Sequence, residues 1–205
     1  MNREALIHVV DDDESFRTSL LELLTAAGFE ARGYASTGDF LLDPTPDRPG
    51  CLLLDVRMPG PSGLDLQASL LRQAKTIPVV FLTGHADVTT GIRAMKAGAV
   101  DFLEKPIQRD ALLDAIQRAL VRDTGRRKAH DEAHRHHERL AALTTRERDV
   151  FERIVAGRLN KQIADELGIS LRTVKVHRAH LMEKLGVATA AELGRFAGEG
   201  RNLHD

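Results

Sequence analysis

Apolar segments alternate with helix-like segments along the first 120 residues of the chain. The apolar runs have the length and composition of buried strands, and most of them end in a polar residue. They lie at Leu6–Val10, 51–54, 78–82 and 99–103, with a weaker strand at Glu30–Tyr34. Helical spacing of apolar residues occurs between them, at 16–27, 64–73, 87–97 and 108–121. This alternation predicts an α/β fold, a doubly wound five-stranded parallel sheet with helices on both faces.

The pattern becomes helical throughout after residue 121. Residues 122–139 lack an apolar stripe and are rich in Arg, His and Glu, which indicates a solvated and partly helical linker. Thr144 and Glu147 then have the spacing of a capping box that opens a helix. Two further helices are expected at Asn160–Leu167, ended by Gly168, and at Leu171–Leu185, capped by Ser170 and ended by Gly186. We therefore predict a first domain at 1–121, a linker at 122–139 and a small all-α domain at 140–203.

Composition narrows the class of protein. The 205 residues are 42% hydrophobic and 29% charged, an ordinary globular balance. No apolar run approaches the roughly 18–20 residues of a membrane span, so we expect a cytoplasmic protein without a membrane partner. The single cysteine, Cys51, excludes an internal disulfide framework.

The net charge of −1 conceals an asymmetry between the two halves. Residues 1–120 carry 12 basic and 17 acidic residues, a net charge of −5, whereas residues 121–205 carry 17 and 13, a net charge of +4. An acidic half joined to a basic half predicts two domains with different partners.

Polar residues with complementary chemistry follow the predicted strands. Asp11 and Asp12 follow the first strand, Asp55 the third, Thr83 the fourth and Lys105 the fifth. Ligands of open parallel sheets bind at this carboxyl edge, and converging carboxylates favour a hard cation, best Mg²⁺. A carboxylate can accept a phosphoryl group, and a lysine and a hydroxyl beside it can neutralise the transferred charge. Any one of these acids alone is more often a turn former or a helix cap; their joint placement predicts a phosphoryl-transfer pocket.

Four segments carry a family resemblance over about 120 residues. IHVVDDDESFRTSL, LLLDVRMPGPSGLDL, VVFLTGHADV and MKAGAVDFLEKPI resemble the receiver domain of two-component response regulators, which has a flavodoxin-like fold. The resemblance implies that Asp55 is the phosphoacceptor of a partner histidine kinase and that Thr83 and Lys105 bind the phosphoryl oxygens. It also implies that Phe102 is the aromatic residue that moves on switching. The implied Mg²⁺ ligands are Asp11 (through water), Asp12, Asp55 and the backbone carbonyl of Arg57.

The same resemblance implies several further features. Lys105–Pro106 matches a cis peptide, and Arg57 and His85 would flank the pocket. In the family, phosphorylation repacks the surface formed by the fourth helix, fifth strand and fifth helix, which is a frequent dimer interface. Residues that could contribute to it here are Val88, Ile92, Met95, Lys96 and Asp101.

The basic half contains a helix, a turn and a longer helix. Ala164 and Gly168 would allow the two helices to approach closely, over a shared core of Ile163, Leu167, Ile169, Val174, Leu181 and Leu185. The opposite face of the second helix presents Arg172, Thr173, Lys175, Val176, Ala179 and His180, which suits entry into a major groove of DNA. A plain helical bundle with a basic solvated face is equally compatible with this pattern alone.

A second resemblance favours DNA binding. The segment LTTRERDVFERIVAGRLNKQIADELGISLRTVKVHRAHLMEKLGV is similar to the LuxR-type helix–turn–helix, a four-helix module. It implies base contacts from Lys175 and Val176 and phosphate contacts from Lys161 and Thr173. Ala179 would make at most an apolar contact with a thymine methyl group. Arg178 lies nearer the inward face by its spacing, so it is a weaker candidate for a base contact than Lys175.

Other candidate residues have simpler interpretations. His130, His134 and His137 share a stripe if the linker is helical, but nothing supplies a fourth metal ligand, so a solvated linker is favoured. Cys51 and His8 are expected to pack inside the sheet domain.

The combination of TGHADV, MKAGAVDFLEKP and the LuxR-type module most resembles the FixJ subfamily of response regulators, which implies a regulator that is not an enzyme. Phosphorylation would promote binding of a homodimer to promoter DNA, with RNA polymerase as a further partner. One alternative is a phosphorylation-dependent protein-interaction module that does not bind DNA. A Mg²⁺-dependent phosphatase with an aspartyl-phosphate intermediate is less favoured, because the chain lacks a DxDx(T/V) motif and a long lid.

Overall fold

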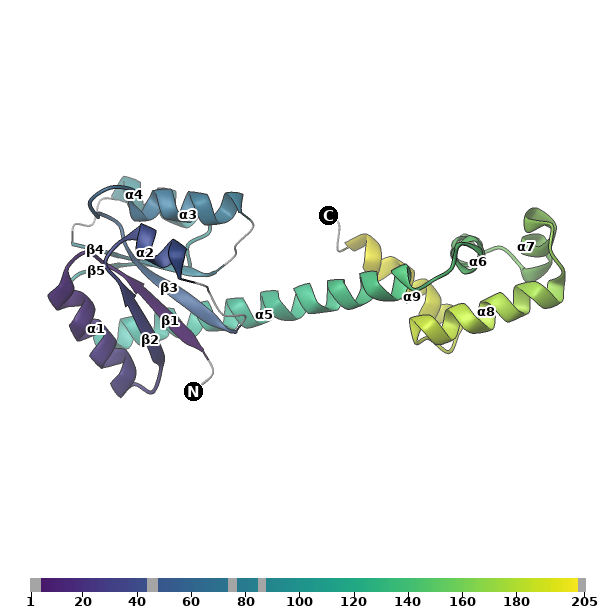
Figure 1. The fold of residues 1–205 in the computed structure, drawn as a ribbon, viewed down its shortest axis with the longest axis horizontal. Coiled ribbons are helices and arrows are strands. Elements are labelled where there is room, and N and C mark those ends of the chain that lie inside the picture. The colour runs from purple at the N-terminus through teal and green to yellow at the C-terminus, as the bar shows by residue number, and fades with distance from the viewer. Residues whose placement is uncertain (1–4, 44–47, 74–76, 85–87, 203–205) are drawn as a thin grey trace. The chain divides into compact units, whose positions relative to one another are not determined.

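The computed structural model describes residues 5–43, 48–73, 77–84 and 88–202, in two compact units at 1–127 and 128–205. The first unit contains a five-stranded parallel sheet of order β2-β1-β3-β4-β5 (Figure 1). Its strands are β1 (Leu6–Val10), β2 (Glu30–Tyr34), β3 (Gly50–Asp55), β4 (Val79–Thr83) and β5 (Asp101–Glu104). This is the flavodoxin-like strand order, so the predicted fold class is confirmed.

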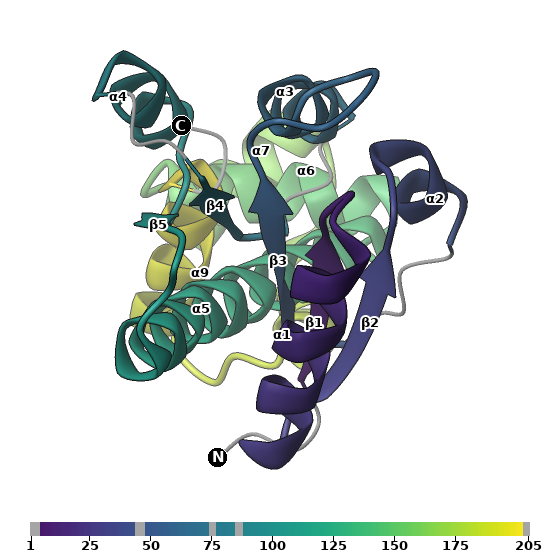
Figure 2. The ribbon, with the colours of Figure 1, turned by 90° about the vertical axis from the view of Figure 1, so that its left-hand side faces the viewer.

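Helices cover both faces of the sheet (Figure 2). They are α1 (Glu14–Ala26), α2 (Thr37–Leu42), α3 (Gly63–Arg72), α4 (Val88–Lys96) and α5 (Arg109–Ala141). The sequence pattern did not predict α2, because six residues are too few to establish a helical period. Its start could have been found from Ser36, whose hydroxyl accepts the Asp39 N–H as an N-cap.

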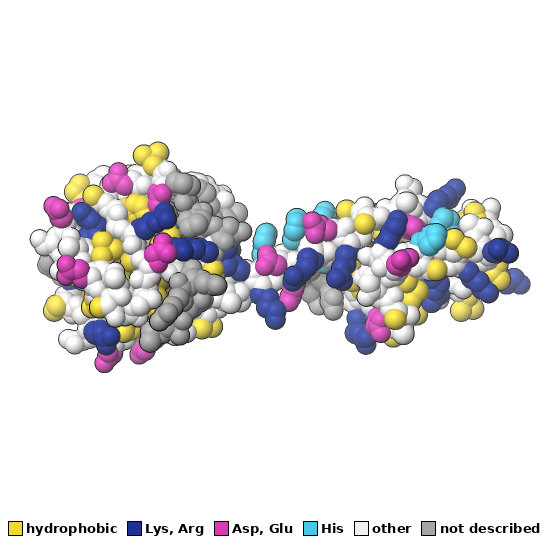
Figure 3. All heavy atoms as spheres, turned by 60° about the horizontal axis from the view of Figure 1, so that its bottom comes forward, with side chains coloured by type: hydrophobic (Ala, Val, Ile, Leu, Met, Phe, Trp, Pro, Cys, Tyr) yellow, Lys and Arg dark blue, Asp and Glu magenta, His cyan; other side chains and the backbone are white. Residues whose placement is uncertain are grey.

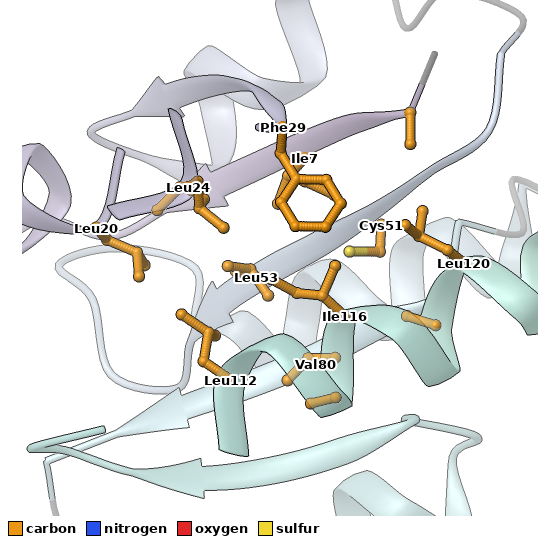
Figure 4. Packing of buried hydrophobic residues seen from close by; sticks show 14 of the residues in the cluster. Ile7, Leu20, Leu24, Phe29, Cys51, Leu53, Val80, Leu112, Ile116 and Leu120 are labelled. Atoms are coloured by element: carbon orange, nitrogen blue, oxygen red, sulfur yellow. The ribbon is translucent and has the colours of Figure 1, made fainter. Parts of the chain in front are cut away.

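Two hydrophobic cores lie on opposite faces of the sheet. One joins α1 and α5 to the strands through residues such as Leu24, Leu53 and Ile116 (Figure 4). The other joins α2, α3 and α4 through residues such as Phe40 and Phe81. Because both faces are covered, β1, β3 and β4 are buried along their whole length, which explains their continuous apolar sequences.

The structure confirms that Cys51 and His8 are packed inside this unit. Cys51 is fully buried in β3. The Nδ1 atom of His8 lies 2.9 Å from the hydroxyl oxygen of Tyr34, and burial lowers the pKa of His8 to about 4. The imidazole is therefore neutral at physiological pH, as expected of a core histidine.

Helix α5 continues without interruption through the polar segment after residue 121. That segment contains many good helix formers and carries ion pairs at i,i+4 spacing, such as Lys128 with Glu132 at 3.9 Å. Asp123 is buried and accepts a hydrogen bond from the Gly50 N–H at 3.1 Å. Arg127 also donates to this carboxylate, at 2.8 Å. Local propensity and these polar contacts explain how a helix forms here without an apolar stripe.

The second unit contains the end of α5 and four further helices. These are α6 (Thr145–Val155), α7 (Asn160–Leu167), α8 (Leu171–Leu185) and α9 (Ala190–Asn202). The six predicted core residues of α7, α8 and the turn between them all belong to or pack against one hydrophobic cluster, which also contains Val150, Leu193 and Phe196. No helix of the described residues is long and apolar enough to span a membrane.

Of the two roles predicted for Gly168, the structure supports the helix end and not the close approach. A Cβ atom at this position would meet no other atom within 4 Å, so the glycine is not needed for close approach of the helices. Its φ angle is +64°, in the left-handed region that ends a helix, which side chains other than glycine adopt at a cost. Ala164, which is buried in the cluster, is the small residue at the contact.

A buried capping box opens α6. The Glu147 carboxylate accepts hydrogen bonds from the Thr144 N–H at 2.9 Å and from the Lys184 ammonium at 2.7 Å. These bonds lower the pKa of Glu147 to about 2, the bond from Lys184 being the largest cause. The carboxylate thus links the start of α6 to α8.

Replacing Glu147 by glutamine is expected to destabilise the second unit by about 1–3 kcal/mol at pH 7, because Lys184 loses its charged partner. The contribution of the carboxylate is complete above its unfolded pKa of 4.5 and is lost as the pH falls towards 2, so the difference from the native chain should shrink over that range. Urea unfolding followed by circular dichroism measures this. Glu152→Gln, an exposed change on the same helix, is the control; equal stability of both variants at pH 7 would contradict the prediction.

Candidate functional site

The carboxyl edge of the sheet gathers four of the predicted pocket residues. The registers of β1, β3, β4 and β5 place Asp11, Asp55, Thr83 and Lys105 at one end of neighbouring strands. The Nζ atom of Lys105 lies 2.7 Å from Oδ2 of Asp11 and 3.1 Å from Oδ1 of Asp55. Both carboxylates are buried, and Lys105 is half-buried between them. The lysine thus bridges two strand-end acids that are far apart in the sequence.

The third predicted carboxylate does not converge with the other two. Asp12 is exposed and has no hydrogen bond or ion pair with the described residues. The described residues contain no group of three His, Cys, Asp or Glu side chains that could already hold a metal ion. In this arrangement Asp12 lies apart from Asp11 and Asp55, which Lys105 bridges. Ligation of a metal ion by the three carboxylates stays a prediction.

Asp13, to which the sequence assigns no role, is the N-cap of α1. Its carboxylate accepts the N–H groups of Ser15 at 2.9 Å and Phe16 at 3.1 Å. Its own N–H donates to Oδ1 of Asp11 at 3.1 Å. The acidic loop is therefore held in place at the start of α1, which fixes the backbone on both sides of Asp12.

The loop after β3 supports Asp55. The backbone N–H of Arg57 donates to Oδ2 of Asp55 at 3.0 Å, while the Arg57 side chain is exposed. Gly63, the first residue of α3, approaches this strand end so closely that an added Cβ would lie 2.2 Å from the carbonyl oxygen of Asp55. Glycine at this position therefore allows α3 to begin directly against the candidate phosphoacceptor.

The electrostatics of the pocket favour an additional positive charge. Burial raises the pKa of Asp55, and the carboxylate of Asp11 adds to that effect, although Lys105 and the Arg57 N–H oppose it. Burial also disfavours the charged form of Lys105, but the hydrogen bonds to Asp11 and Asp55 outweigh it and raise the pKa of the lysine. Two carboxylates with one ammonium leave a net negative site of hard oxygen donors, and the exposed carboxylate of Asp12 adds a further donor. This donor chemistry fits a divalent cation such as Mg²⁺.

The other predicted residues of the receiver domain lie on β4, on β5 and just after β5. Thr83 is buried at the end of β4, and its carbonyl accepts the N–H of Lys105 at 2.7 Å. The Lys105–Pro106 peptide is cis, as the resemblance implies. Phe102 is half-buried, with its ring centroid 6.3 Å from that of Phe81. His85 lies outside the described residues.

An aromatic ring that the sequence did not indicate also borders the lysine. The Nζ atom of Lys105 lies 4.1 Å from the centroid of the Phe16 ring. Phe16 reads in the sequence as an ordinary apolar position of α1, and no local signal relates it to Lys105. Only the spatial arrangement of α1 and the end of β5 brings the two together.

The predicted DNA-facing residues lie on the surface of the second unit. Lys and Arg side chains, drawn in dark blue, are spread over this unit in Figure 3. The exposed members of the predicted set are Lys161, Arg172, Lys175, Val176, Ala179 and His180. Thr173 is half-buried, and its hydroxyl oxygen lies 2.8 Å from that of Ser170, the N-cap of α8. Val174, between these positions, is fully buried, so α8 has one core face and one basic face.

Arg178 is half-buried, in line with its inward spacing. Its guanidinium donates to Oδ1 of Asn160 at 3.1 Å and so links the middle of α8 to the start of α7. In the linker segment, the described residues hold no three-ligand metal group around His130, His134 and His137, and His134 is paired with Glu138.

Comparisons with known proteins agree with both halves of the structure. Residues 7–117 match the response regulator receiver domain family, and residues 141–197 match the luxR family of bacterial regulatory proteins. A receiver fold with this pocket, joined to a LuxR-type helix–turn–helix, defines a transcriptional response regulator. This class implies a histidine kinase and DNA as partners.

Relatives of similar length narrow the class further. The chain is 42% identical to nodulation protein W of Bradyrhizobium diazoefficiens, over 95% of this chain and 86% of that protein. It is also 42% identical to the transcriptional regulatory protein FixJ of Rhizobium meliloti, over 95% of both chains. The solved structure of the response regulator StyR is 44% identical, with a TM-score of 0.90 over 96% of this chain and 99% of that one. The chain therefore belongs to the FixJ subfamily of two-component response regulators.

Proposed function

We propose that a histidine kinase phosphorylates Asp55 and that the phosphorylated chain binds promoter DNA as a homodimer to control transcription. The observation that carries this proposal is the Lys105 ammonium between the buried carboxylates of Asp11 and Asp55, in a chain that also carries an exposed basic helix. Because DNA is the target, the cytoplasm is the proposed location. RNA polymerase is a further proposed partner.

Asp55 is the proposed nucleophile. One of its oxygens forms a bond to phosphorus while the bond between phosphorus and the donor breaks, so the phosphoryl group moves without a change of redox state. Asp12, Asp55 and the Arg57 carbonyl, with Asp11 acting through water, would hold a Mg²⁺ ion that neutralises part of the phosphoryl charge. Lys105 would exchange carboxylate oxygens for a phosphoryl oxygen, and the Thr83 hydroxyl would donate to another.

The switch is proposed to follow from the added charge. The phosphoryl group brings close to two negative charges into a pocket that already contains buried carboxylates. Movement of Thr83 towards it would leave space for Phe102, which is half-buried beside Phe81. The exposed side chains of Val88, Ile92 and Met95 on α4 are then available as a dimer surface, joined by Lys96 and by Asp101, which is ion-paired with Arg118.

The chain is proposed to act as a regulator of transcription and not as an enzyme. Neither alternative, a phosphatase or an interaction module without DNA binding, is favoured by a specific observation. The exposed basic residues of α8, on a helix whose other face is buried, favour DNA binding over a protein-interaction role.

Phosphorylation is expected to shift the full-length chain towards dimers and to increase its affinity for DNA by about tenfold, as is typical of coupling of 1–3 kcal/mol between two sites. A small phosphodonor with Mg²⁺ supplies the phosphoryl group, and sedimentation and DNA titration are measured before and after. The Asp55→Asn variant, treated in the same way, should show neither change. If phosphorylation alters neither the sedimentation nor the DNA affinity of the native chain, the proposed switch is wrong.

A further inference from the structure

The ring of Phe16 occupies a specific place beside the phosphoryl-transfer pocket. It lies in the first turn of α1, directly after the acidic loop, and its backbone N–H is held by the carboxylate of Asp13 at 3.1 Å. The ring is half-buried and packs against the core between the sheet, α1 and α5. The loop that carries Asp11 and Asp12 therefore also determines where this ring lies.

The ring face meets the ammonium of Lys105. A distance of 4.1 Å from Nζ to the ring centroid is well within the range of a cation–π contact. The bonds of the ammonium to Asp11 and Asp55 coexist with this contact. Two partners that are close in the sequence, Asp11 after β1 and Phe16 in α1, and one from the end of β3, Asp55, thus surround one ammonium group.

We infer that Phe16 is a positioning residue for Lys105, keeping its ammonium at the pocket while the lysine exchanges carboxylate oxygens for a phosphoryl oxygen. This inference rests on the proposed roles of Asp55 and Lys105. A lysine side chain is long and flexible, and its free ammonium is strongly hydrated. The ring excludes water from one side of the ammonium and attracts the charge without competing for an oxygen partner. The lysine therefore loses less conformational freedom when the phosphoryl group arrives.

Phosphorylation kinetics of the full-length chain test this role. With Mg²⁺ and acetyl phosphate, Phe16→Leu should lower the phosphorylation rate constant by about three- to tenfold, because leucine fills the apolar site without a ring face. Phe16→Tyr, which keeps the ring face, should retain most of the native rate. Leu23→Ala truncates a half-buried residue of α1 that packs against the same core, and it controls for general loosening of that core.

A double-mutant cycle separates positioning from packing. In a Lys105→Met background, Phe16→Leu should change the residual rate by less than about twofold, because the ring no longer has a cation to position. If Phe16→Leu lowered the rate by the same factor in both backgrounds, the inference would be overturned. It would also be overturned if Phe16→Leu kept the native rate, or if Phe16→Tyr lowered the rate as much as Phe16→Leu. Unfolding curves verify that each variant is folded, and Phe16→Met replaces Phe16→Leu if the latter is not. The Asp55→Asn variant separates this inference from the proposed function. If it takes no label, Asp55 remains the proposed phosphoacceptor even when the Phe16 inference fails. If it is labelled, the proposed phosphoacceptor is wrong.

Discussion

Replacing Asp55 by asparagine is expected to lower acid-labile phosphorylation of the full-length chain by about 100-fold or more, because an amide is not a competent nucleophile for phosphoryl transfer. The side chain keeps its size, so α3 can still begin against the strand end at Gly63. Incorporation from a radioactive small phosphodonor with Mg²⁺ measures the effect. The native chain should incorporate label, and chelation of the metal should prevent this.

Asp114→Asn provides a matched control for the loss of one carboxylate. Asp114 is exposed on α5 in the same unit, so its replacement should leave labelling unchanged. Asp12→Asn has a different expected result: more Mg²⁺ should be needed to reach the same rate, because one oxygen donor loses its charge. Undiminished labelling of Asp55→Asn would show that another residue accepts the phosphoryl group.

Lys175→Ala is expected to reduce the affinity for a selected DNA duplex by about tenfold or more and to reduce discrimination between that duplex and a shuffled one. Lys175 is exposed on α8 beside the buried Val174, on the face proposed to enter the major groove. A base contact of this kind is worth roughly 1–3 kcal/mol of discrimination. The probe is a duplex selected from a random-sequence library by the phosphorylated native chain.

Lys161→Ala tests the proposed phosphate contact on α7 with the same two duplexes. It should weaken binding to both about equally and lower the slope of log affinity against log salt by about 1, since one fewer phosphate is neutralised. The two lysines are thus distinguished by specificity and by salt dependence. If Lys175→Ala left both the affinity and the discrimination unchanged, α8 would not be the reading helix.

Much of the site was predictable because the fold places strand ends together. The alternation of strands and helices required that the residues after β1, β3, β4 and β5 meet at one edge, which brought Asp11, Asp55, Thr83 and Lys105 into one pocket. The basic face of α8 was predictable for a similar reason, since helical spacing separates Val174 and Leu181 from Lys175 and Val176. Gly168 shows both the reach and the limit of this reasoning: its role as a helix end was predicted correctly, whereas its role in close helix packing was not needed.

The amino-acid sequence alone was enough for the five strands, most of the helices, several helix caps, the division of charge and the identity of the strand-end residues, because these depend on local period and residue type. The tertiary structure decided which of those groups actually meet. Asp11 and Asp55 bond to Lys105, Asp12 remains in solvent, and Phe16 lies against the lysine. Side-chain direction at a strand end depends on neighbours that are distant in the chain, and no local spacing encodes it.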